Sequence, residues 1–90
     1  MKVLVEFFGI PRLRIGVAEH TIEVPDDATI ERLYVVLASQ LPAFAEHCLT
    51  EHKLLPGFIA SINGRRFVKD SSERIHQGDA IQILSADVGG

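Results

Sequence analysis

The feature that most constrains the fold of this chain is one amphipathic helical stripe between residues 30 and 41. Its apolar members are Ile30, Leu33, Tyr34, Leu37, Ala38 and Leu41. Side chains three and four positions apart share one face of a helix, so this spacing predicts a single helix that buries that face. Thr29 precedes the stripe and is a favourable N-cap residue, and Pro42 ends this helix or starts the next one.

Two β-prone runs precede the predicted helix. Residues 2–8 are rich in apolar, β-branched and aromatic side chains, and residues 20–24 alternate polar with apolar ones. Gly9, Pro11 and Gly16 lie between these runs and predict a loop. The side chains that we expect to face the core are Val3, Val5, Phe7, Ile22 and Val24.

Three more predicted strands follow the helix. Residues 58–62 and 65–69 flank Asn63-Gly64, a strong hairpin signal because both residues tolerate a positive φ. Residues 80–85 form the last strand. The remaining predicted elements are a short helix over residues 43–53 and one helical turn over residues 70–74.

This order of elements predicts an α+β fold. The first and last strands are the most apolar, so we expect them to lie side by side and parallel in the middle of a mixed five-stranded sheet. One main helix covers one face, with a second short helix beside it, which is the β-grasp or ubiquitin-like architecture. We expect residues 1–85 to form this one domain and residues 86–90 to form a flexible C-terminal tail.

Composition excludes several classes of function. Nine basic and twelve acidic side chains give a net charge of −3, so we expect no nucleic-acid partner. No apolar run is long enough to span a bilayer, and the first residues lack the pattern of a signal peptide. A single cysteine, Cys48, cannot form an internal disulfide. We therefore expect a cytoplasmic protein without a membrane partner.

The body of the chain offers little chemistry of its own. His47, Cys48 and His52 are the candidate ligands or nucleophiles, but neighbouring residues on a helix point about 100° apart, and no second cysteine completes a zinc set. No phosphate-binding glycine loop is present. We therefore expect no metal and no cofactor bound by this chain.

A set of short motifs in a fixed order resembles one known family. They are Phe7-Phe8-Gly9 followed by Arg12, then Thr29, Leu41-Pro42, Ile62-Asn63-Gly64, Gly78-Asp79-Ala80-Ile81 and a final Gly89-Gly90. Together they resemble the MoaD/ThiS sulfur carriers, most closely the small subunit of molybdopterin synthase. That branch usually has a Pro-Pro pair before the tail, whereas this chain has Ser85-Ala86-Asp87-Val88.

The resemblance implies that the chain is a carrier or co-substrate rather than an enzyme. An E1-like adenylyltransferase of the MoeB/ThiF type would adenylate the Gly90 carboxylate with ATP-Mg, and a sulfur donor would convert it to a thiocarboxylate. In the molybdopterin branch this sulfur is delivered within a hetero-oligomer with a MoaE-type large subunit.

The tail and the open face of the sheet are the predicted contact regions. Gly89 and Gly90 have no Cβ, so they suit a narrow channel in a partner. The other residues that we expect to bind a partner are Phe8, Arg12, Ile81, Ile83, Asp87 and Val88, with Leu4 as a further candidate.

Three classes of function stay open at this point. The first is a sulfur carrier, for molybdopterin or for another pathway such as thiamine, tungsten cofactor, cysteine or tRNA thiolation. The second is a ubiquitin-like modifier that joins Gly90 to lysines of other proteins. The third is a β-grasp interaction module with an inert tail.

Overall fold

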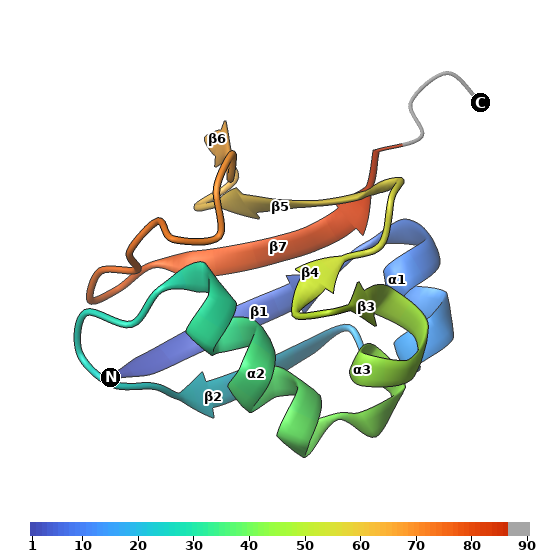
Figure 1. Ribbon diagram of the computed structural model, residues 1–90, viewed down its shortest axis with the longest axis horizontal. Coiled ribbons are helices and arrows are strands. Elements are labelled where there is room, and N and C mark those ends of the chain that lie inside the picture. The colour runs from blue at the N-terminus through green and yellow to red at the C-terminus, as the bar shows by residue number, and fades with distance from the viewer. Residues whose placement is uncertain (87–90) are drawn as a thin grey trace.

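A mixed sheet of five strands in the order β2-β1-β7-β5-β6 forms the centre of the fold (Figure 1). The computed structural model describes residues 1–86. The strands of this sheet are β1 (Lys2–Phe7), β2 (Glu19–Glu23), β5 (Phe58–Ile62), β6 (Arg66–Phe67) and β7 (Ala80–Ser85). A separate small hairpin consists of β3 (Leu49–Thr50) and β4 (Lys53–Leu54). The helices are α1 (Gly9–Ile15), α2 (Ile30–Gln40) and α3 (Pro42–Cys48).

The first and last strands lie in the middle of the sheet, as predicted. β1 and β7 are parallel, with Val5 opposite Ile81 and Phe7 opposite Ile83. All four of these side chains are at most 1% exposed. β2 pairs with β1, and β5 pairs with β7, both antiparallel. The predicted β-grasp fold of the α+β class is confirmed.

α2 buries the predicted stripe against the sheet. Ile30, Leu33, Tyr34 and Leu37 are buried, and the Arg32 N–H donates a hydrogen bond of 3.2 Å to the Thr29 hydroxyl at the start of the helix. This bond satisfies one of the backbone donors that a helix start leaves without a partner. The predicted helix and its cap are therefore confirmed.

α3 completes the core with one aromatic side chain. Phe44 is fully buried, and its ring lies 6.2 Å from that of Phe7 and 6.0 Å from that of Tyr34. These tilted contacts join β1, α2 and α3 in one cluster.

The predicted loop after β1 is wrong, because residues 9–15 form α1. Pro11 occupies the first turn of this helix. Backbone N–H groups in a first turn have no intrahelical acceptor, so proline, which lacks this group, is tolerated there. Gly16 adopts φ 87° at the C-cap, and its N–H donates to the Arg12 carbonyl. Residues that suggest a loop therefore serve as the start and stop of a helix.

The predicted helix over residues 43–53 is too long at its C-terminus. α3 ends at Cys48, and the β3–β4 hairpin follows. Glu51 and His52 both have positive φ values, 49° and 66°, which a helix cannot accommodate. A tight hairpin turn without glycine or proline left no signal in the sequence.

The predicted helical turn over residues 70–74 is only partly right, because a single hydrogen-bonded turn forms over residues 70–73 and the rest of the segment is extended along α2. The carbonyl groups of Ser71 and Glu73 accept hydrogen bonds of 2.9 Å from the N–H groups of Glu31 and Ile30. These are the first N–H groups of α2, so the segment lies along the start of that helix and satisfies its backbone donors. A single hydrogen-bonded turn, from the Glu73 N–H to the Asp70 carbonyl, remains.

Within residues 1–86, no helix has both the length and the apolar character that crossing a membrane requires.

The side chain of Glu73 holds the segment of residues 70–74 in place. Its carboxylate accepts hydrogen bonds from the Arg66 guanidinium and from the Lys69 N–H, the latter at 2.8 Å. These bonds, that of Arg66 first, lower the pKa of Glu73 to about 2. The charged form is therefore favoured in the folded protein, and the segment after β6 depends on it.

We predict that Leu37→Ala lowers the free energy of unfolding by about 2–5 kcal/mol, because it removes a fully buried side chain beneath α2. Val35→Ala on the exposed side of the same helix changes it by less than about 0.5 kcal/mol. Urea denaturation of the two variants checks the pair. Equal losses would contradict the assignment of the core.

We predict that Glu73→Gln lowers the melting temperature at neutral pH. The pKa of Glu73 is lowered on folding, so its contribution is fully present above its ordinary pKa of 4.5 and is lost as pH falls towards about 2. Thermal melts at several pH values check this. The difference between wild type and variant should shrink over that window, and a difference that stays constant down to the acid end would refute it.

Candidate functional site

The tail begins at a fixed point at the end of the central strand. The Ala86 N–H donates a hydrogen bond of 2.7 Å to the Gly57 carbonyl, directly after β7 ends at Ser85. Figure 1 shows that this end of β7 lies beside α1, and a Cβ built at Gly9 would lie 3.9 Å from that of Ser85. The predicted tail residues Asp87, Val88, Gly89 and Gly90 lie outside the described residues.

One face of the sheet carries none of the helices of residues 1–86 and has a hollow in it. α2 and α3 lie on the other face (Figure 1). The hollow has a volume of about 300 Å³. Its lining residues are Phe8, Ser61, Gly64, Arg65, Arg66, Phe67, Gln82 and Leu84. We call this region the open-face hollow.

Two exposed aromatic rings flank the open-face hollow. Phe8 is 45% exposed and Phe67 is 59% exposed. Large apolar side chains that stay this exposed beside a concave surface are typical of a protein-binding site. The predicted exposure of Phe8 agrees with this arrangement.

Gln82 holds the floor of the open-face hollow in place. Its side-chain oxygen accepts hydrogen bonds from the Ser61 hydroxyl at 2.7 Å and from the Gly64 N–H at 2.8 Å. Its side-chain nitrogen donates to Glu6 at 3.0 Å. One amide thus links β1, β5, β7 and the turn before β6, so the floor is preorganised.

The prediction that Ile81 or Ile83 faces a partner is wrong. Both are 0% exposed and lie in the core beneath the helices. Because side chains alternate along a strand, the outward positions of β7 are Gln82 and Leu84. Both of these line the open-face hollow.

The sequence does not indicate Phe67, because the hairpin loop is one residue longer than its Asn63-Gly64 turn suggests. Asn63 and Gly64 have φ values of 55° and 65°, as predicted. A two-residue loop would pair Phe67 with Ala60 on the core face, but the structure pairs it with Ser61. A shift of one residue turns a side chain to the opposite face, so Phe67 lies on the open face.

α1 and the residue after its C-cap form an exposed apolar strip beside the start of the tail. Ile10 is 40% exposed, Leu13 82% and Val17 38%. Arg12, on the same helix, is exposed, and its side chain makes no hydrogen bond or ion pair within residues 1–86. Arg14, by contrast, donates to the His47 carbonyl at 3.0 Å and lies 5.3 Å above the Phe58 ring.

The cysteine is not placed for nucleophilic chemistry. Cys48 is fully buried, and this burial raises the pKa of its thiol, although Arg14 lowers it in part. A neutral thiol without solvent access is a poor nucleophile. Within the described part of the chain, no three His, Cys, Asp or Glu side chains are grouped as a metal site requires.

Solved structures similar to this one cover nearly the whole chain. SAMP1 from Haloferax volcanii has a TM-score of 0.85 at 19% identity, with all of both chains covered. A protein assigned as subunit 1 of molybdopterin converting factor in Pyrococcus furiosus has a TM-score of 0.71 at 27% identity, over 93% of this chain and 95% of that one. No family model and no curated protein matches the sequence.

A further similar structure is a protein–protein complex. It contains subunits 1 and 2 of the molybdopterin-converting factor from Helicobacter pylori. The match has a TM-score of 0.67 at 21% identity and covers all of this chain and all of the matched chain. The similar proteins are thus small modifier proteins or converting-factor subunits, one of them seen with a partner subunit. The predicted resemblance to the MoaD/ThiS family is confirmed by the converting-factor subunit at 27% identity. The other two structures share the β-grasp fold with this chain.

Proposed function

We propose that this chain is a sulfur carrier of molybdopterin biosynthesis, with Gly90 as its reactive residue. The observation that carries the proposal is the similarity over nearly the full chain to the converting-factor subunit of Pyrococcus furiosus, at 27% identity. The Gly89-Gly90 pair supports it, because residues without a Cβ suit the narrow channel of an activating enzyme. The reaction belongs in the cytoplasm, where the partner enzymes would act.

The chemistry proceeds on the Gly90 carboxylate in the active site of an E1-like adenylyltransferase. The carboxylate attacks the α-phosphorus of ATP and releases pyrophosphate, leaving an acyl adenylate. The terminal sulfur of a persulfide then attacks the acyl carbon and expels AMP. Reduction of the resulting S–S bond by a thiol frees the thiocarboxylate, and this chain itself binds neither the nucleotide nor a metal.

The folded body supplies binding energy that the tail lacks. Fixing each tail residue in a channel costs about 1–2 kcal/mol of backbone entropy. The open-face hollow offers two exposed aromatic rings, and α1 offers an apolar strip with Arg12 beside the start of the tail. We propose that the activating enzyme and a MoaE-type large subunit dock here in turn, each forming a hetero-oligomer with this chain.

A second candidate is a ubiquitin-like protein modifier. The similarity to SAMP1, a small archaeal modifier protein, at a TM-score of 0.85 favours it. The same acyl adenylate would then pass to a lysine amine and form an isopeptide bond. Adducts of this chain that survive reducing denaturing gels would support conjugation, and their absence beside a sulfurated Gly90 would leave the carrier role alone.

We predict that incubation with ATP, magnesium, a sulfur donor and the activating enzyme exchanges one oxygen for sulfur at Gly90. Intact-mass and fragment-ion spectrometry locate the change. A variant without Gly90 should stay unchanged under the same conditions and should fail to support molybdopterin synthesis. A sulfur gain elsewhere, or full synthesis without Gly90, would overturn the proposal.

We predict that Phe8→Ala and Phe67→Ala each weaken docking to the activating enzyme, because each removes an exposed aromatic anchor. The expected loss in kcat/KM for adenylation is about 10- to 100-fold. Val35→Ala removes a comparably exposed apolar side chain from α2, on the other face, and serves as the matched control. If the control loses as much activity as Phe8→Ala while all variants keep their melting temperature, docking uses a different surface.

A further inference from the structure

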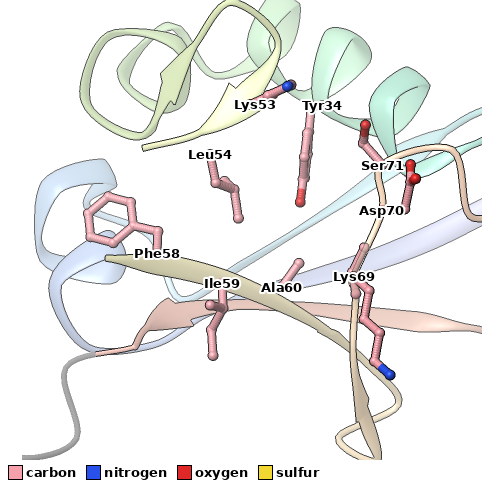
Figure 2. Close-up of a pocket in the computed structure, with 10 residues that line it drawn as sticks. Tyr34, Lys53, Leu54, Phe58, Ile59, Ala60, Lys69, Asp70 and Ser71 are labelled. Atoms are coloured by element: carbon pink, nitrogen blue, oxygen red, sulfur yellow. The ribbon is translucent and has the colours of Figure 1, made fainter. Parts of the chain in front are cut away.

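A second hollow lies on the helix side of the sheet, between the β3–β4 hairpin and β5 (Figure 2). Its volume is about 370 Å³. Leu54, Ala60 and Val68 give it an apolar floor, and Lys53, Lys69 and Asp70 belong to its lining. We call it the hairpin cleft, and the sulfur chemistry proposed above does not use it.

The hydroxyl of Tyr34 is a polar group of this cleft that is largely buried and yet has no hydrogen-bond partner within residues 1–86. Tyr34 is 4% exposed, and Figure 2 shows its hydroxyl pointing from α2 towards Ala60, into the gap beside Leu54. It makes no hydrogen bond within residues 1–86. Every side-chain N or O atom of these residues that is fully enclosed has a partner, so the Tyr34 hydroxyl is not fully enclosed. The hydroxyl is therefore reachable from the cleft.

Burial keeps this hydroxyl neutral. Desolvation raises the pKa of Tyr34 far above its ordinary value of 10.0, so the group donates a hydrogen bond at any physiological pH. A donor that has no partner within the protein is left to water, and an acceptor that enters the cleft can take the place of that water.

Charges near the cleft largely offset one another. Asp70 accepts a hydrogen bond of 2.8 Å from the Ser72 N–H, which lowers the pKa of its carboxyl, and Lys53 acts on it in the same direction. Glu73 is paired with Arg66. Figure 2 shows the ammonium group of Lys69 pointing away from the gap. An uncharged ligand therefore suits the cleft better than an ion, since an ion would give up its hydration for a weak net field.

We propose that the hairpin cleft binds a small uncharged apolar molecule that carries one hydrogen-bond acceptor, such as a ketone or amide carbonyl. The apolar floor takes the hydrocarbon part, and the Tyr34 hydroxyl donates to the acceptor. Small-molecule sites of this size usually combine apolar contacts with a polar group that fixes the orientation of the ligand.

Cyclohexanone is a suitable probe, with cyclohexylammonium as the matched compound that has the same ring but no acceptor. We expect cyclohexanone to bind the whole chain with a Kd of about 1–10 mM, as befits seven non-hydrogen atoms. Amide NMR signals of Leu54, Ala60 and Val68 should shift with increasing cyclohexanone. Cyclohexylammonium should leave them in place.

Two variants complete the test. Tyr34→Phe keeps the ring against Phe44 and should weaken cyclohexanone binding about 3- to 10-fold at an unchanged melting temperature. Thr21→Val removes a hydroxyl from β2 and should leave binding unchanged. Equal binding of both compounds, shifts confined to Phe8 and Phe67, no binding at all, or full affinity in Tyr34→Phe would each overturn the proposal.

Discussion

The parallel pairing of β1 with β7 is the interaction on which the rest of the structure depends. These strands are far apart in the sequence, and they supply the most deeply buried side chains of the sheet, including Val5, Phe7, Ile81 and Ile83. A parallel pair must be connected by a crossover, which here carries the helices and the remaining strands. The last strand is therefore held on both sides, by β1 and by β5, and the start of the tail is anchored in the centre of the sheet.

This arrangement separates the roles of the two faces. α2 and α3 cover one face and complete the core through Phe44, while the other face keeps Phe8 and Phe67 exposed beside a preorganised floor. Gln82 and Ile83 are neighbours on β7, yet one binds the side chains of the open face and the other lies in the core. The alternation of one strand thus links the stability of the fold to the surface that we propose for docking.

Much of the fold could be predicted from local pattern and composition. The stripe of α2, the limits of β5 and β7 and the central place of β1 and β7 follow from periodicity and apolar content. α1 could not be predicted in the same way, because its Pro11 and Gly16 are equally common in loops. The β3–β4 turn was missed because Glu51 and His52 adopt positive φ values that their residue types rarely take.

The site was less predictable, since it depends on register. The exposure of Phe8 could be predicted from its place at the end of the first strand. Phe67, by contrast, reaches the open face only through a one-residue shift in its hairpin. Ile81 and Ile83 share one face of β7, and its pairing with β1 is needed to show that this face is the core face. The cleft around Tyr34 arises from the packing of a hairpin that had no signal in the sequence.

The most direct test of the carrier role follows the carbonyl carbon of Gly90 itself. The chain is prepared with carbon-13 at its glycine carbonyl groups and observed by NMR with the activating enzyme, ATP and a sulfur donor. We predict that one signal, that of the terminal carboxylate, moves strongly downfield to the position of a thiocarboxylate, while the amide carbonyls of Gly16 and Gly64 stay in place. A terminal signal that remains at the carboxylate position with a fully active enzyme would contradict it.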